Sequence, residues 1–132
     1  MKRSRIVVDT NVLIYATIED SEHHEEAYRI VTKRHIVIPY VVLYEYLWVL
    51  LKLTNDVKFT KIKIEELKTF KLLHEDIDTI RTGLEILNKD GAPPTTANDY
   101  IILATAMLEG ALATYDKRLR KLAERHGVNV IP

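Results

Sequence analysis

The sequence predicts an α/β protein built around a parallel β-sheet. Short runs of aliphatic, β-branched residues alternate along the chain with segments of helical spacing, which is typical of parallel α/β folds. The 132 residues fit one domain, so we expect a single domain over residues 1–132. Hydrophobic residues make up 47 % of the chain and charged residues 29 %, enough for a core beneath a solvated surface.

Short apolar runs bounded by turn residues are the predicted strands. They are Arg5–Val8, Ile36–Ile38, Lys71–Leu73 and Ala111–Thr114, with Val128–Ile131 as a final strand or tail. Because a helical segment follows each of the first four, we expect the strands to run parallel.

Helices are predicted where apolar residues recur every three or four positions. They are Asn11–Thr17, Ser21–Lys33 with Ser21 as its cap, Tyr40–Leu53, Asp76–Lys89, Asn98–Glu109 and Lys117–His126. Pro39 suits the start of the third helix. The segment 59–69 stays open between helix and strand, and 90–97 is predicted to be a loop because it is rich in Gly, Pro and Thr.

Composition excludes several classes of function. The chain has no cysteine, which removes disulfides, thiolate metal sites and cysteine nucleophiles, and its five histidines show no metal-binding spacing. The longest apolar stretch, residues 36–51, is interrupted by Pro39 and Glu45 and is shorter than the roughly 20 residues of a membrane helix. We therefore expect a cytoplasmic protein with no membrane partner. The formal net charge is zero, so nucleic-acid binding would need a local basic patch.

Two acids directly follow predicted strands. Asp9 comes after the first strand, and Asp116 comes two residues after Thr114, where the fourth strand ends. Ligands of open parallel sheets bind outside the carboxyl ends of the strands, so both acids are well placed for chemistry. The alternative for Asp9 is that it only caps the next helix, as Asp often does.

Two further acids lie on helices. Asp99 is in the first turn of the helix that leads into the fourth strand, which brings it to the same edge in a right-handed arrangement. The exposed N–H groups of a helix start are an alternative reason for an acid there. Glu45 lies in a helix without a clearly polar face, so we expect it to be buried opposite a cation. An ion pair or an oligomer interface is the alternative for Glu45.

Four carboxylates at one edge repel each other and raise each other's pKa unless a cation neutralises them. Oxygen ligands without cysteine or a histidine pair fit Mg²⁺ or Mn²⁺ better than Zn²⁺. Asp9, Glu45, Asp99 and Asp116 are therefore predicted to form one acidic metal site.

Four segments resemble the motifs of the PIN-domain family in their order and spacing. These segments are IVVDTNVLIY, YVVLYEYLWVL, NDYIILATA and LATYDKRL. The resemblance implies a three-layer α/β/α domain with a central parallel sheet of four or five strands. It also implies a Mg²⁺- or Mn²⁺-dependent endoribonuclease with those four acids as its catalytic and metal-binding residues. Asn11 and Thr114 match supporting positions, Asn11 as an orienting residue and Thr114 as a hydrogen-bond partner of the site.

Small proteins of this length resemble the VapC-type toxins of toxin–antitoxin pairs. The implied partners are an RNA substrate, an antitoxin protein and a second copy of the chain in a homodimer. Arg118, Lys121 and Arg125 share one face of the last helix, and we expect Arg118 and Lys121 to contact RNA phosphates. The alternative is an ordinary solvated face with basic residues near a helix C-terminus.

Other functions stay open on the sequence alone. A housekeeping RNA-processing nuclease would use the same site as a toxin. A phosphate-transferring enzyme of the haloacid-dehalogenase kind also has an acid after its first strand, but it resembles DxD there, and position 11 is Asn. A PIN-like scaffold that only binds a partner is the third alternative, although a pure scaffold has no reason to gather four acids.

Overall fold

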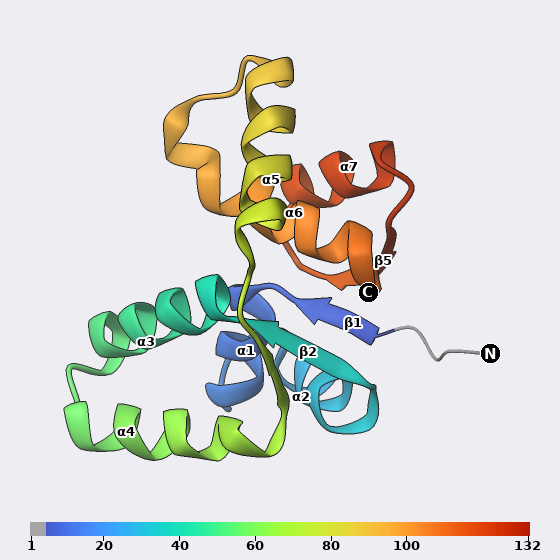
Figure 1. The fold of residues 1–132 in the computed structure, drawn as a ribbon. Coiled ribbons are helices and arrows are strands. Elements are labelled where there is room, and N and C mark those ends of the chain that lie inside the picture. Colours follow the sequence, from blue (N-terminus) through green and yellow to red (C-terminus); the bar gives the residue numbers. More distant parts are fainter. Residues whose placement is uncertain (1–4) are drawn as a thin grey trace.

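The computed structural model describes residues 5–132, so residues 1–4 of the predicted domain lie outside the described part. A five-stranded sheet forms the centre of the molecule, and all its strands are parallel (Figure 1). In chain order the strands are β1 (Arg5–Val8), β2 (Ile36–Pro39), β3 (Lys71–Leu73), β4 (Gly110–Ala113) and β5 (Asn129–Ile131). Their spatial order is β3-β2-β1-β4-β5, which confirms the predicted α/β class with a parallel sheet.

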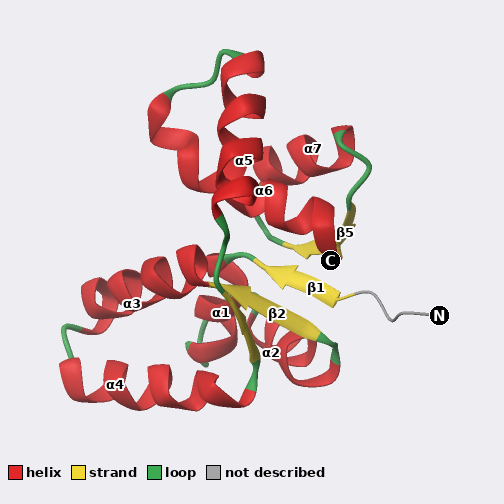
Figure 2. Ribbon diagram, in the orientation of Figure 1, coloured by secondary structure: helices red, strands yellow, loops and turns green. Residues whose placement is uncertain are grey.

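Helices cover both faces of this sheet and complete the three layers (Figures 1 and 2). One layer holds α1 (Thr10–Thr17), α2 (His24–Lys33), α3 (Tyr40–Thr54) and α4 (Val57–Glu66). The other holds α5 (Ile77–Asp90), α6 (Ala97–Glu109) and α7 (Lys117–Arg125). The chain moves outward from β1 to β3 and then returns to β4 on the other side of β1. Right-handed crossovers in these two opposite directions place the two groups of helices on opposite faces.

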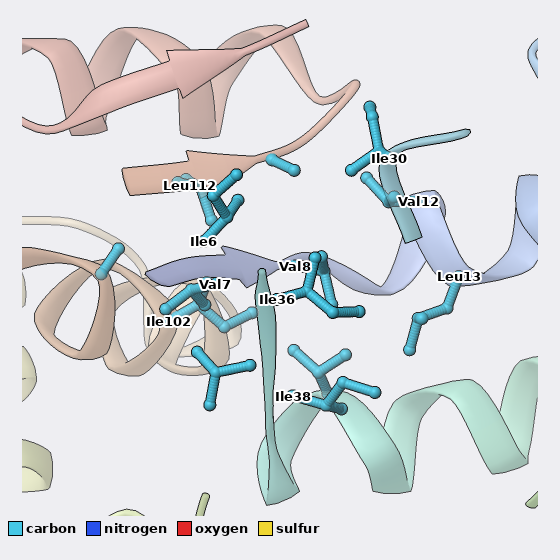
Figure 3. Packing of buried hydrophobic residues seen from close by; sticks show 14 of the residues in the cluster. Ile6, Val7, Val8, Val12, Leu13, Ile30, Ile36, Ile38, Ile102 and Leu112 are labelled. Carbon is cyan, nitrogen blue, oxygen red and sulfur yellow. The ribbon is translucent and has the colours of Figure 1, made fainter. Parts of the chain in front are cut away.

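The core lies on both faces of the inner strands. Every residue of β2 is buried, as are the last three of β1 and of β4. Figure 3 shows Ile6 and Val7 pointing to opposite sides of β1, with Val7 next to Ile102 of α6. Strands buried on both faces have continuous apolar sequences rather than alternating ones. This explains the continuous apolar runs at Arg5–Val8 and Ile36–Ile38, which were predicted as strands.

Two local predictions need correction, and two that were left open are decided. Ser21 does not cap α2: its hydroxyl donates to the carbonyl of Tyr15 at 3.1 Å, and the helix begins three residues later, after His23. The ambiguous segment 59–69 is helical, because it belongs to α4 and to the 3₁₀ turn η1 (Leu67–Thr69). The predicted loop 90–97 contains a second 3₁₀ turn, η2 (Pro94–Thr96). The final segment is a strand, β5, rather than a tail.

Helices α5 and α6 approach each other closely at Gly83. A Cβ atom on Gly83 would lie 2.8 Å from the carbonyl oxygen of Tyr100, which is closer than van der Waals contact allows. Glycine is therefore required at this contact, since no side chain fits between the two helix backbones. In residues 5–132 no helix combines the length and the hydropathy that a membrane crossing requires.

Candidate active site

The sheet order makes β1 and β4 neighbours, although the chain reaches β4 only after β2 and β3. The connections leave β1 and β4 in opposite directions along the sheet, so their carboxyl ends form the topological switch point, where open α/β sheets bind ligands. Asp9 follows β1, and its N–H donates to the carbonyl of Ala113 in β4 at 2.9 Å. The backbone thus holds Asp9 at this switch point.

Asp9 is a buried carboxylate with no cationic partner among the described residues. Its side chain has 6 % exposure, and no Lys, Arg or His within residues 5–132 forms an ion pair with it. Oδ1 accepts from the N–H of Thr10 at 2.8 Å, and Oδ2 accepts from the hydroxyl of Thr114 at 2.7 Å. Burial raises the pKa of Asp9 to about 6, against the effect of these two hydrogen bonds and with smaller contributions from the charges of Asp99 and Glu45. Such surroundings make Asp9 a candidate for a functional site.

Thr114, Asn11 and Asp116 join the start of α1 to the loop after β4. The hydroxyl of Thr114, which donates to Asp9, accepts from the N–H of Asp116 at 3.0 Å. The side-chain amide oxygen of Asn11, Oδ1, accepts from the N–H of Tyr115 at 3.2 Å. Asp116 itself caps α7, since its Oδ1 accepts from the N–H groups of Arg118 and Leu119.

The capping alternative is therefore correct as far as it goes. Asp9 caps α1 and Asp116 caps α7. Each carboxylate has a structural hydrogen bond and still lies at the carboxyl edge of the sheet.

Asp99 lies in the first turn of α6, as predicted, and its charge acts on the other acids. Its pKa is raised chiefly by burial, then by the charges of Asp116 and Glu45, while the charge of Arg118 lowers it. Together with the pKa of Asp9, these effects link all four predicted acids in one electrostatic group.

Glu45 differs from its prediction in one respect: it is half-buried rather than enclosed. The lack of a polar face on α3 indicated burial, but Tyr44 and Trp48 of the same helix are 65 % and 60 % exposed. The outer face of α3 is apolar and open to solvent. The lack of a polar face on this helix therefore did not mean that the whole helix is buried.

The four carboxylates offer oxygen ligands to a cation, but within residues 5–132 they do not form a closed metal cage. Among residues 5–132, no three Asp, Glu or His side chains are arranged to hold a single ion. Mg²⁺ keeps several of its waters and binds proteins through one or two carboxylates, so it does not need a closed cage. The hydroxyl oxygen of Thr10, next to Asp9, is also buried and has no hydrogen-bond partner in the described chain. A site made only of oxygen donors fits Mg²⁺ or Mn²⁺.

Basic side chains adjoin this edge. Arg118, Lys121 and Arg125 of α7 all line a hollow of about 250 Å³ between α6 and α7, and Asp99 lines it as well. We call it the α6–α7 hollow; Ala92, Thr96, Tyr100, Leu119 and Leu122 complete its wall. The three basic residues of α7 thus border one hollow, which Leu119 and Leu122 of the same helix also line.

An aromatic group beside the site was not predicted. The ring of His23 stacks on Tyr115 with a centroid distance of 4.3 Å, and the Tyr115 hydroxyl donates to Glu26 at 2.8 Å. Burial and Glu26 together raise the pKa of Tyr115. Tyr115 could have been placed beside the site from the sequence, because it lies between Thr114 and Asp116. No feature of the sequence indicated this for His23, because only the turn between α1 and α2 brings it there.

Comparison with solved structures finds the same fold in toxins and toxin–antitoxin complexes. VapC20 of Mycobacterium tuberculosis, described as a sarcin-ricin loop cleaving toxin, aligns with a TM-score of 0.75 at 15 % identity, over 89 % of this chain and 94 % of that one. VapBC2 from Rickettsia felis, bound to a promoter DNA fragment, aligns with a TM-score of 0.71 at 17 % identity, over 96 % of each chain. A toxin–antitoxin complex from Klebsiella pneumoniae gives 0.68 at 22 % identity, also over 96 % of each chain.

The search of curated protein sequences gave no match. The family model of the PIN domain, in contrast, matches residues 6–125, which includes all four acids and nearly the whole described chain. With the parallel five-stranded sheet and the toxin folds that align with it, this match establishes that the chain belongs to the PIN domain family.

Proposed function

We propose that this chain is a metal-dependent endoribonuclease and the toxin of a toxin–antitoxin pair. The observation that carries the proposal is Asp9, a buried acid at the topological switch point, which has no ion-pair partner in residues 5–132 and feels the charges of Asp99 and Glu45. Membership of the PIN domain family supports nuclease activity, and the toxins of similar fold support the toxin role.

Asp9 and Asp99 are the residues we assign to hold the cation, with Glu45 and Asp116 completing the site through water or a second ion. Mg²⁺ or Mn²⁺, when bound, supplies a Lewis acid that polarises the scissile phosphate and lowers the pKa of a bound water. Thr114 fixes one oxygen of Asp9, and Asn11 fixes the loop that carries Asp116. These hydrogen bonds hold the acids in place before substrate arrives.

The reaction is hydrolysis of a phosphodiester bond. Water adds to phosphorus, the bond to the 3′ oxygen breaks, and the products carry a 5′ phosphate and a 3′ hydroxyl. An acidic edge repels RNA, so cations must lie beside it. Arg118 and Lys121 meet this need, because they line the hollow that also contains Asp99.

The outer face of α3 is the proposed protein-binding surface. Tyr44, Leu47 and Trp48 are exposed there, and large aromatic residues are enriched at protein interfaces. We assign this face to a homodimer or to the antitoxin. Three solved complexes of similar fold contain a toxin with its antitoxin, which favours an antitoxin partner for this chain as well.

The decisive experiment is RNA cleavage with Mn²⁺, with EDTA, and with Asp9→Asn in Mn²⁺. We expect cleavage by the wild type in Mn²⁺ alone. Glu109→Gln is the matched control, since it removes a carboxylate paired with Arg5 at the opposite end of β1 and should cleave like the wild type. Cleavage that persists in both EDTA and Asp9→Asn would overturn the metal mechanism.

A PIN-like scaffold without catalysis predicts a different result. Such a scaffold would bind no Mn²⁺ at a specific site. Isothermal titration of Mn²⁺ into the wild type and, separately, into Asp9→Asn measures this directly. Saturable binding that Asp9→Asn weakens supports the nuclease.

A further inference from the structure

We propose that the α6–α7 hollow binds one unpaired nucleotide of the RNA next to the cleaved bond. In this arrangement the base enters the hollow, and Arg118 and Lys121 hold its phosphate. The inference rests on the proposed ribonuclease function and adds to it a binding site for the base beside the cleaved bond.

The size and lining of the hollow suit one base. Its volume of about 250 Å³ is below the range of roughly 300–1,000 Å³ that drug-sized ligands occupy, so it has room for one ring system and not for several nucleotides. Ala92, Leu119 and Leu122 give it an apolar wall, and Leu119 is fully buried. An apolar wall with a few polar groups at the rim is typical of sites that bind a flat, partly apolar ligand.

The far end of the hollow is fixed by a small polar network. Asp90 accepts from the hydroxyl of Tyr100 at 2.7 Å and forms an ion pair with Arg125 at 2.9 Å. Both Tyr100 and Arg125 line the hollow, so these bonds hold two of its walls in place. The hollow is preformed at this end, which reduces the entropy lost on binding.

The end of the hollow nearest Asp99 carries two cationic side chains, Arg118 and Lys121. Within residues 5–132, the guanidinium of Arg118 and the ammonium of Lys121 form no hydrogen bond or ion pair, in contrast to Arg125. Arg binds phosphate oxygens with two N–H groups at once, and Lys acts as a point charge. These two side chains are therefore available for a phosphate.

Asp99 connects the hollow to the acidic edge, because it lines the first and belongs to the second. A base in the hollow thus places its adjoining phosphate beside the carboxylates. A paired base cannot enter without leaving its duplex, which costs a few kcal/mol. Sequence-dependent RNA binding commonly uses unpaired bases for this reason.

The test measures binding without cleavage, in the Asp9→Asn background with EDTA. The probe is a fluorescein-labelled 12-nucleotide single-stranded RNA, compared by anisotropy with the same strand lacking its bases and with the same sequence as a duplex. Ala92→Trp fills the hollow from the loop after α5, and Thr96→Trp fills it from η2. Thr82→Trp on the exposed face of α5 is the control for adding a tryptophan.

We expect each filling variant to weaken binding of the single strand about tenfold, within the range of one base contact, and to leave the strand without bases unchanged. Arg118→Ala with Lys121→Ala should weaken both strands, whereas Lys58→Ala on α4 should weaken neither. The duplex should bind at least about tenfold more weakly than the single strand.

Equal binding of the single strand by the wild type and by both filling variants, each with a normal thermal melt, would overturn the inference. Equal loss for strands with and without bases would also overturn it, because the hollow would then sense only the backbone. Either failure leaves metal-dependent cleavage untouched, and a chain that cleaves no RNA would fail the separate test with Mn²⁺ and EDTA.

Discussion

The carboxylates at the two ends of β1 differ in their partners. At the amino end, Arg5 donates two hydrogen bonds to Glu109, at 2.9 and 3.1 Å. At the carboxyl end, Asp9 is more deeply buried and is engaged only by Thr10 and Thr114, with no ion-pair partner in residues 5–132. A buried charge that the fold leaves unneutralised destabilises the protein, so the difference indicates that Asp9 is kept for a ligand.

The largest expected effect is on the rate of RNA cleavage, when Asp9 and Glu109 are neutralised in separate variants. Asp9→Asn should lower the rate of RNA cleavage in Mn²⁺ about a thousandfold, because it removes a proposed ligand of a metal ion whose chemistry would supply several kcal/mol. Glu109→Gln should change that rate less than about twofold, since Glu109 has only a structural partner. Steady-state cleavage of one RNA by the two variants makes the comparison, and equal losses would show that the two ends are not different in kind.

The pH dependence of stability should show the penalty at Asp9. Burial raises its pKa from 3.8 to about 6, so the folded protein holds this proton more tightly than the unfolded chain. The resulting stability is complete below pH 3.8 and is lost as the pH rises through about 6, which amounts to about 3 kcal/mol.

Denaturation in EDTA tests this pH effect. The free energy of unfolding of Asp9→Asn, relative to the wild type, should grow between pH 4 and pH 7 and then stay constant. Glu109→Gln serves as the control and should show no such rise. A flat difference for Asp9→Asn would mean that its carboxylate carries no penalty for burial.

The support of Asp9 by Thr114 should have a smaller effect. Thr114→Val removes the hydroxyl that lowers the pKa of Asp9, so that pKa should rise further and Mn²⁺ affinity should fall about tenfold at neutral pH. The acidic limb of the pH–rate profile should move to higher pH. Thr105→Val, which removes a buried hydroxyl within α6, is the matched control and should leave the profile in place.

The smallest expected effect is at the paired end. Arg5→Ala leaves Glu109 without its partner and should lower the free energy of unfolding by about 1 to 2 kcal/mol, a modest value because both side chains keep some contact with solvent. Cleavage measured well below the melting temperature should be unchanged. Replacing both residues, with Arg5→Met and Glu109→Leu, should restore most of the stability. If Arg5→Ala lost as much activity as Asp9→Asn, the distinction between a structural pair at one end of β1 and a functional acid at the other would be wrong.

The sheet could be predicted from the sequence because inner parallel strands are buried on both faces and have continuous apolar runs. Val7 and Val37 are examples, each with no exposed surface. Predictions failed where one residue type is compatible with two local structures. Ser21 has the residue type of a helix cap, but it bonds to Tyr15 instead.

The site was predictable to the extent that topology alone positions its residues. Asp9 and Asp99 follow from strand ends and a right-handed crossover, and the structure brings their charges together. The exposure of Glu45 was not predictable, because an apolar surface on α3 and an apolar core give the same sequence pattern. The α6–α7 hollow depends on how two helices pack, and no short segment encodes that.

Gly83 gives the molecule a hidden dependence. A methyl group there would press on the carbonyl of Tyr100 and force α5 and α6 apart. Tyr100 is the next residue after Asp99, so a wider spacing between α5 and α6 would also displace the carboxylate of Asp99. Gly83, a residue without a side chain, thus helps to set the position of Asp99 at the acidic edge by fixing the spacing of α5 and α6.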